Sequence, residues 1–441
     1  MSTSSMRALA RLGLVLALAS QGVPRPAQAA DTLGLEQVFA DVLAHDPMIE
    51  AQGHETAAAA AKARRAGAFE APMLELMVEN VPTSGGFGMD PMTMRVVGLE
   101  QRVTVSGVRT LERRAAEAET RAQEAQRDDV RWQRLSLAWQ AYADAYWAGQ
   151  RAAAARDHRA IMDRMAAAAK ARYESGRGRL EDMLRVESER ARIEADAVTF
   201  EAEAVGARAR LAELRGLGGD GTDVTLAEPV GALAPDSLAA WREVIDAHPR
   251  VRTQREREQS RRISAAAMRR MVWPDLTLRA SYGFRGEVQG VPQDDMWSAG
   301  VGIMLPIGTG ARQGAEAAAM TAMAEAARAE GRSEALALER ELRGLRAEAR
   351  AASRMASLLA DTVAVADRRT LAAAWASYET ARTDLAGVFD AAHALYAEEL
   401  EVTRARQSEA RALARLLAIT ARGELVGVRI ATADATREGV R

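Results

Sequence analysis

The sequence predicts a mainly α-helical protein with a small β part. Three observations indicate this fold class. Alanine and arginine, which are good helix formers, dominate the chain. Landmark residues recur 202 positions apart, and four short segments alternate apolar with polar residues. The expected architecture is an internally duplicated set of long coiled-coil helices with four strands.

Composition narrows the function classes. The 441 residues are 48% hydrophobic, and 59 basic against 61 acidic side chains leave a net charge of −2. Such a balance gives no global basic field, so nucleic acid is not an expected partner. The chain has no cysteine, which removes disulfides, thiolate metal sites, cysteine nucleophiles and the lipid-modified cysteine of a lipoprotein.

Residues 1–30 resemble an export signal. Arg7 and Arg11 precede the apolar stretch 12–19 (LGLVLALA), and Ala27-Gln28-Ala29 fits the cleavage pattern of small residues. This apolar stretch is shorter than the roughly 20 residues that span a bilayer. We expect a signal peptide over 1–30 and a mature protein outside the cytoplasm.

The rest of the chain contains an internal duplication of one unit. Pro47 and Pro249 lie 202 positions apart, as do Pro72 and Pro274, and Gly98 and Gly300, whereas Tyr173 and Tyr378 are 205 apart. The second copy therefore carries a small insertion. We place the first repeat at 31–230, the second at 231–425 and a C-terminal tail at 426–441.

Each repeat shows the same order of helices. A helix starts at a proline, a very long helix follows the strands, and a shorter helix follows a Gly/Ser or Thr/Asp interruption. The predicted ranges are 48–68, 108–172 and 180–215 in the first copy, and 250–271, 311–377 and 385–421 in the second. A helix of some 65 residues is about 100 Å long. In the first copy the two shorter helices, placed end to end, approach the length of the long one; the second copy matches less closely. The expected shape is a rod with hairpin turns at one end and a sheet at the other.

The four strands are predicted over about 72–82, 92–105, 274–285 and 296–307. In 275–285, Leu276, Leu278, Ala280, Tyr282 and Phe284 alternate with polar or small residues, which predicts one apolar face. Ten residues with aromatics at one end suit a bilayer-spanning strand, although a half-buried soluble sheet fits any single strand equally well. Four such strands cannot close alone, and an open edge in lipid leaves backbone groups unpaired. Several chains must then share one ring around a duct.

The long helix of the first copy carries an aromatic stripe. Its residues, spaced three and four apart, are Trp132, Leu135, Trp139, Tyr142 and Tyr146. This spacing indicates either a left-handed supercoil with a neighbouring helix or the aromatic core of an ordinary bundle.

Taken together, the signal peptide, the duplication, the Asp46-Pro47 and His248-Pro249 helix starts and the paired strands resemble the TolC-type outer-membrane efflux proteins. The likeness covers about 33–421, and 104–114 (TVSGVRTLERR) is similar to the cation-efflux, CzcC-like branch. The resemblance implies a trimeric α/β-barrel duct in the outer membrane of a Gram-negative bacterium, with four transmembrane β-strands per chain and the helices in the periplasm. The implied partners are two sister chains (a homotrimer), a periplasmic adaptor of the membrane fusion class, an RND-type inner-membrane pump and outer-membrane lipid.

The resemblance also implies where the functional residues lie. The family's turn motif, an aromatic residue followed by glycine and then aspartate, matches Tyr173, Gly176 and Asp182; the second copy has Tyr378 and Ala381, but Gly387 at the aspartate position. We expect adaptor contacts at the periplasmic tips, which contain Tyr173, Gly176, Arg177, Asp182, Tyr378, Ala381, Arg382 and Asp384. Glu379 and Asp390 are the expected pore constriction. The alternative is that these are ordinary solvated charges at helical turns.

Neither a cofactor nor a metal site is expected, because the five histidines lack ligand spacing. Methionines near the strands could favour soft cations such as Cu(I), although flexible apolar packing is the more common use of this residue. The chain shows no catalytic motif, so we do not expect an enzyme. The predicted function is the passive exit duct of a tripartite efflux pump, with metal cations as one candidate substrate. The alternative is a soluble periplasmic coiled-coil scaffold or adaptor.

Overall fold

The computed structural model describes residues 32–83, 90–218, 224–234, 238–305, 307–380 and 382–430. The predicted signal peptide and Ala381 lie outside these ranges. The first half contains α1 (Leu35–His45), α2 (Pro47–Ala66), β1 (Met73–Glu79), β2 (Met94–Val103), α3 (Val108–Glu174) and α4 (Leu180–Leu214). The second half contains α5 (Leu238–Ala247), α6 (Pro249–Arg270), β3 (Asp275–Arg285), β4 (Met296–Met304), α7 (Gly310–Leu358), the π-turn η2 (Leu359–Val363), α8 (Ala364–Glu379), α9 (Leu385–Thr420) and the 3₁₀ turn η3 (Gly423–Val426).

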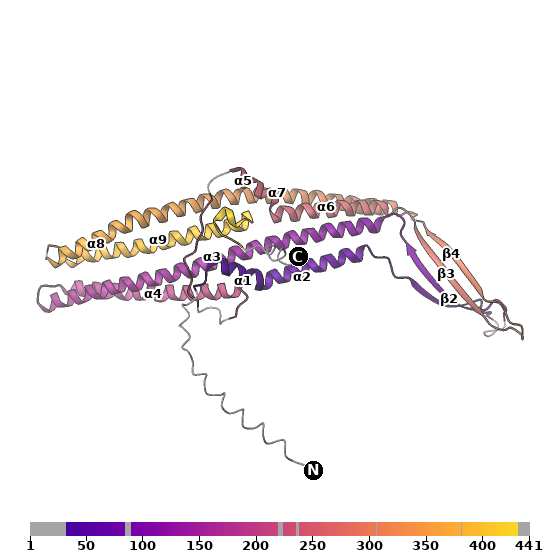
Figure 1. Ribbon diagram of the computed structural model, residues 1–441, viewed down its shortest axis with the longest axis horizontal. Helices are drawn as coiled ribbons and strands as arrows, with labels where there is room; N and C mark the ends of the chain where they lie inside the picture. The colour runs from indigo at the N-terminus through magenta and orange to yellow at the C-terminus, as the bar shows by residue number, and fades with distance from the viewer. Residues whose placement is uncertain are drawn as a thin grey trace, which may run out of the picture.

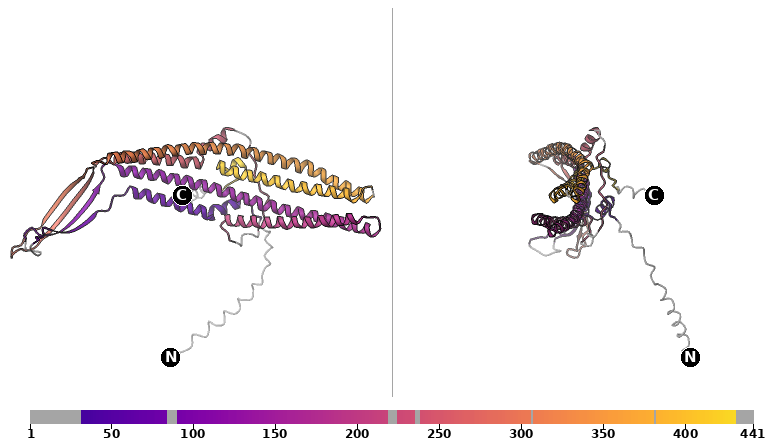
Figure 2. Two further views of the ribbon diagram at one scale, coloured as in Figure 1. Left: turned by 180° about the vertical axis from the view of Figure 1, so that it is seen from behind. Right: turned by 90° about the vertical axis from the view of Figure 1, so that its left-hand side faces the viewer.

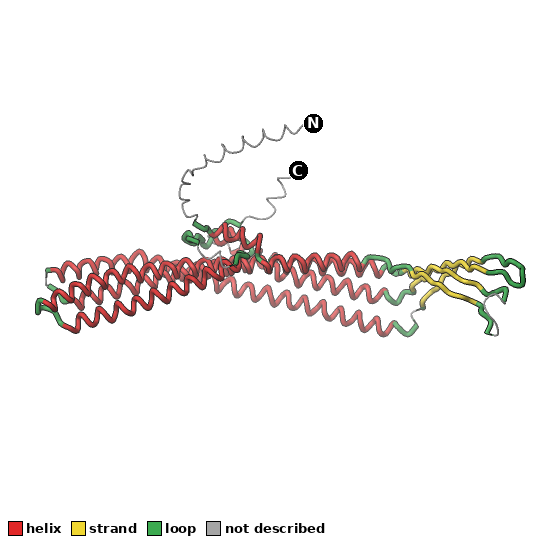
Figure 3. Tube along the Cα trace, turned by 90° about the horizontal axis from the view of Figure 1, so that it is seen from below, coloured by secondary structure: helices red, strands yellow, loops and turns green. Residues whose placement is uncertain are grey.

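The helices form one long, curved layer. Figure 1 shows the sheet at one end of the layer and the two hairpin turns at the other, and the end view in Figure 2 shows the arc. α3 runs the length of the helical part and packs against α2 and α4 on one side and α6 and α9 on the other. α7 and α8 complete the layer beyond α6 and α9. The predicted rod, with short helices stacked end to end beside a long one, is confirmed (Figure 3).

The helix starts of the two repeats are capped by different side chains. Asp46 accepts hydrogen bonds from the backbone N–H of Met48 (2.8 Å) and Ile49 (3.3 Å) at the start of α2. At the same place in the second repeat, His248 Nδ1 accepts from Arg250 N (3.2 Å). A proline follows each cap, where its missing N–H costs nothing. Asp46 also separates α2 from the preceding helix α1 (Leu35–His45), in agreement with the helix start expected at Pro47.

The aromatic stripe of α3 is core. Leu135, Trp139 and Tyr142 are fully buried in a cluster formed with α1, α5, α7 and α9. The Tyr142 hydroxyl lies 2.8 Å from Leu33 O and 2.6 Å from Ala227 O and donates its single proton to one of them at a time, which ties the two connecting segments to α3. Both interpretations of the stripe require this burial, and the stripe packs against neighbouring helices as each of them predicts. Residues from the start of the expected tail join it, since Val426 and Val428 are buried.

The helical run of the second repeat, from α7 to α8, is three residues longer than the uninterrupted helix α3. The equivalent helical run of the second copy contains the π-turn η2, in which the i→i+5 pattern accommodates an additional residue without ending the helix. The change of offset from 202 to 205 between Gly300 and Tyr378 spans this turn. The π-turn accounts for one of the three additional residues.

The sheet is antiparallel, and its strands follow the chain order β1-β2-β3-β4. β2 and β3 pair along their length, with Leu99 opposite Ala280 and Val97 opposite Tyr282. β1 and β4 each have one neighbour, so each leaves one edge of backbone N–H and C=O groups unpaired within the chain.

Candidate functional site

One face of the sheet is apolar and exposed. Its side chains come from the alternate positions predicted from the sequence, and Trp297 and Leu76 keep 78% and 72% of their surface accessible. The other exposed members are Leu74, Val78, Val97, Leu99, Leu278, Tyr282, Phe284, Val301 and Ile303. A continuous apolar face of this kind is rare on a water-exposed monomer and indicates an apolar surrounding.

Ion pairs occupy the opposite face. Arg279 lies between two acids, 3.3 Å from Glu75 and 2.5 Å from Glu100. Arg102 pairs with Asp275 at 2.6 Å. The charged pairs cross from strand to strand, so this face is both polar and fixed in register.

β2 has the weakest alternation, and the structure explains it. Arg95 and Gln101 share the apolar parity, near the two ends of the strand. Gln101 Nε2 donates to the carbonyl oxygens of Glu70 (3.0 Å) and Arg102 (2.9 Å), so its polar end is satisfied. The apolar stretch between them is short but unbroken.

Exposed aromatic side chains lie near both ends of the sheet. At the helical end, Phe69 and Trp273 are 65% and 63% exposed, and Arg109 lies 3.6 Å above the Phe69 ring. At the far end, Tyr282 and Phe284 make an edge-to-face contact beside Trp297. The far-end cluster lies on the apolar face, and aromatic residues at the end of an apolar band are typical of strands crossing a lipid bilayer.

The first helical tip is a tight glycine turn. Gly176 adopts φ +69°, the left-handed region that glycine enters without strain. Gly178, which the sequence reasoning missed, is equally constrained: a Cβ there would lie 2.8 Å from Tyr173 N and 2.9 Å from Arg172 C. Tyr173 is 45% exposed, Arg177 is exposed, and Asp182 lies half-buried in the first turn of α4.

The second tip is joined to the first through Arg172. Its guanidinium lies 4.0 Å from the centre of the Tyr378 ring and donates to Tyr378 O (3.1 Å), so Tyr378 is buried where its counterpart Tyr173 is exposed. Asp384 caps α9 by accepting from Gly387 N (3.2 Å), and Arg382 is exposed. Arg172 was not among the expected site residues, and no pattern in the sequence marks it.

The expected constriction residues lie on the second hairpin. Glu379 is exposed at the end of α8. The Asp390 side chain is 70% exposed and lies 3.2 Å from Arg185 of α4. Arg185 also stacks over Phe389, 4.2 Å from the ring centre. Within one chain, Asp390 therefore joins α9 to α4, a second link between the hairpins that sequence reasoning missed.

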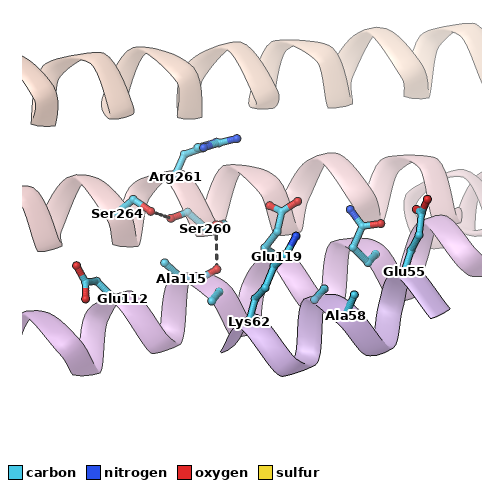
Figure 4. Close-up of a pocket in the computed structure, with 12 residues that line it drawn as sticks. Glu55, Ala58, Lys62, Glu112, Ala115, Glu119, Ser260, Arg261 and Ser264 are labelled. Carbon is cyan, nitrogen blue, oxygen red and sulfur yellow. Dashed lines mark hydrogen bonds between the residues drawn. The ribbon is translucent and has the colours of Figure 1, made fainter. Parts of the chain in front are cut away.

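A groove of about 640 Å³ lies over α3, between α2 and α6 (Figure 4). Its floor is made of small residues such as Ala115, whose carbonyl oxygen accepts from Ser260 Oγ (2.9 Å). The charged side chains along its rim, Glu55, Lys62, Glu112, Glu119 and Arg261, are exposed or half-buried. We interpret it as a solvated groove between helices.

Neither a metal cluster nor a membrane-spanning helix is found in the described part of the chain. No group of three or more His, Asp or Glu side chains there could hold a metal ion. Among the same residues, no helix combines the length and the apolarity needed to cross a membrane.

Comparison with known proteins identifies the fold. Neither the family models nor the curated proteins give a match. Solved structures do. A membrane protein from Pseudomonas aeruginosa aligns with a TM-score of 0.74 at 20% identity, over 88% of this chain and 93% of its own. The outer membrane channel MtrE of Neisseria gonorrhoeae, in its open state, aligns with a TM-score of 0.74 at 17% identity, over 88% and 89%. The chain has the fold of outer-membrane channels.

A third structure agrees. The outer membrane protein VceC of Vibrio cholerae aligns with a TM-score of 0.72 at 17% identity, over 88% of this chain and 96% of its own. These matches confirm the predicted fold class of long helices with a small antiparallel sheet.

Proposed function

We propose that three copies of this chain form a passive exit duct through the outer membrane of a Gram-negative bacterium. The observation that carries the proposal is the sheet. It has an exposed apolar face, an ion-paired polar face and two unpaired edges. Lipid can solvate the apolar face and water the polar face, whereas the unpaired edges need the backbone groups of neighbouring strands. A closed sheet of twelve strands, four from each chain, meets all three demands.

Both edges of the helical layer support assembly with further copies. On α4, Val198 and Val205 are 59% and 61% exposed, seven residues apart on one face. At the opposite edge, Leu336, Met355 and Leu358 of α7 are at least half exposed. Because the apolar residues lie on two different edges, the contact is head to tail, and rotation closes it into a ring.

The partners are proposed from the position of the tips. The hairpin turns lie at the end of the layer farthest from the sheet, where they would meet a periplasmic adaptor carrying cargo from an RND-type inner-membrane pump (Figure 1). The exposed tip residues that could contact it include Tyr173, Arg177 and Arg382. Three copies of Asp390 and Glu379 would ring the narrow end and favour cations.

Metal cations are the proposed substrate class. The polar face of the sheet carries more carboxylates (Glu75, Glu79, Glu100 and Asp275) than guanidinium groups (Arg102, Arg279 and Arg285). A negative lining raises the local concentration of cations. It does not by itself select among them, because a duct conducts what its pump delivers.

Conductance in a planar lipid bilayer tests the duct. We expect the purified mature protein to insert and give steady ohmic currents without nucleotide or a proton gradient. Asp390→Ala should change cation preference, and Asp384→Ala, which removes a cap on the same hairpin, serves as its control. If a carbonate wash releases the protein from the membrane fraction in soluble form, and the protein gives no current, the result would instead support the periplasmic scaffold.

A further inference from the structure

The methionines of the sheet all lie on its polar face. Met73, Met77, Met94, Met296 and Met304 share the parity of the ion-paired residues, as the strand registers show. The apolar face of the described strands has no methionine; apart from Arg95 and Gln101 near the ends of β2, it uses leucine, valine, isoleucine, alanine and aromatic residues. A methionine would suit that face as well as a leucine does. The thioethers are thus placed where water and solutes have access.

Three of these residues gather near the far end of the sheet. Met77 and Met296 occupy one register row, separated by Val96 and Gly283. Met94 lies one residue pair farther out on β2, diagonal to Met77. Diagonal neighbours of this kind lie about 7–8 Å apart, within reach of long side chains.

Gly283 brings the sulfur of Met94 toward Met296. The Met94 Sδ lies 2.6 Å from the position that a Gly283 Cβ would take, so any larger residue would displace it. The sulfur therefore occupies the space above β3, and Met296 is the register partner of Gly283 on the other side. Paired residues of antiparallel strands have Cα atoms about 4.5–5.5 Å apart. The flexible Met296 side chain can bring its sulfur to the same ion as Met94.

Packing over Gly283 accounts for the place of Met94 but not for the exposed Met77 and Met296. Methionine commonly fills gaps in cores. Here Met77 and Met296 are 39% and 42% exposed, on a face that also carries Arg279 and its acids. Glu79, the register partner of Met94, adds a carboxylate beside the sulfurs. Thioether ligands prefer soft ions such as Cu(I), and a carboxylate favours positive charge.

We propose that the polar face of the sheet contains a thioether site for a soft monovalent cation, Cu(I) or Ag(I). Met94 and Met296 are the central ligands, and Met77 is within reach as a third. The site deepens the proposed function, because it rests on the polar face being the lining of the duct. Soft cations would then bind transiently at the end of the duct that is farthest from the helices.

Silver titration of the full-length protein in detergent tests the site. The probe is silver nitrate in chloride-free buffer, with heat of binding as one readout and the ¹³C-methyl signals of methionine as another. The double variant Met94→Leu/Met296→Leu should bind about tenfold or more weakly, since removing ligands or their supports lowers metal affinity by that order. The control Met48→Leu/Met323→Leu removes two exposed sulfurs from α2 and α7, away from the sheet, and should bind as the wild type does.

Two results would overturn the inference: no saturable silver uptake by the wild type, or equal uptake by both double variants. The methyl signals of Met94 and Met296 should shift in the wild type, which keeps the test valid even if the leucine variant folds poorly. Conductance measured in parallel separates the two proposals. Current without silver uptake rejects the site and leaves the duct, whereas saturable uptake without current supports the site and rejects the duct.

Discussion

Replacing Arg279 by leucine should make the duct more selective for cations. Arg279 is held between Glu75 and Glu100 on the polar face, so its loss leaves both carboxylates without their guanidinium partner. In a trimer the lining loses three positive charges. Leucine is compatible with a β-strand at this position, and the substitution leaves the lipid-facing residues unchanged.

The size of the effect follows from the geometry. Twelve strands about 4.8 Å apart, tilted by about 40°, form a ring of backbone radius about 12 Å. Three charges about 10 Å from the axis, in water with a screening length of about 10 Å, shift the potential there by about 20 mV. This change in potential lowers the energy of a cation in the duct and raises that of an anion by the same amount, so the cation-to-anion permeability ratio should change about fivefold.

The assay is the reversal potential in a potassium chloride gradient across a planar bilayer. Arg279→Lys should keep the wild-type value. Arg95→Leu is the matched control, because it removes one arginine from the opposite face of the same sheet. An unchanged reversal potential for Arg279→Leu, or an equal shift for Arg95→Leu, would refute the assignment of the two faces.

Three further predictions concern stability. Asp46 caps α2 and pairs with Arg134 (2.7 Å). Asp46→Asn, which removes the ion pair and keeps the cap, should lower the free energy of unfolding by about 2 kcal/mol, and Asp46→Ala, which removes both, by about 1 kcal/mol more. Denaturant titration measures both, and equal losses would contradict the capping role. Gly178→Ala should speed proteolysis at the first tip because its Cβ meets backbone, whereas Gly206→Ala, with open space around it, should not. Burial lowers the pKa of His158 to about 4, so the unfolded chain takes up the proton at a higher pH than the folded protein does. The free energy of unfolding should therefore fall by about 3 kcal/mol as the pH falls from about 6.5 to 4. His158→Phe should flatten this pH dependence, and the same pH dependence in the variant would argue against the role of His158.

The sequence predicted the elements that have a period. The duplication, the long helices and the strand faces all repeat along the chain, and burial or lipid exposure enforces those repeats. The strand alternation located Tyr282, Val301 and the other apolar residues correctly, and the glycine of the tip was found at Gly176, where φ is positive.

What the sequence did not predict depends on contacts between distant segments. α5 was missed because its ten residues are held by packing against α6, α7 and α9. The links Arg172–Tyr378 and Arg185–Asp390 join residues about two hundred positions apart, and arginine is too abundant in this chain for any one to stand out. The burial of Tyr378 against the exposure of Tyr173 likewise follows from one partner, not from the repeated motif.

Cysteine cross-linking tests the shared sheet most directly, because the chain has no cysteine of its own. Leu76→Cys on β1 is combined in turn with Ala299→Cys, Val301→Cys or Ile303→Cys on β4. Within one chain, β2 and β3 separate these strands by three spacings of about 4.8 Å, beyond the roughly 7 Å that a disulfide can span. At least one pair should oxidise to a ladder of covalent dimers and trimers that stops at three chains. Monomers alone from every pair, or a ladder that continues past three, would contradict the closed twelve-stranded sheet.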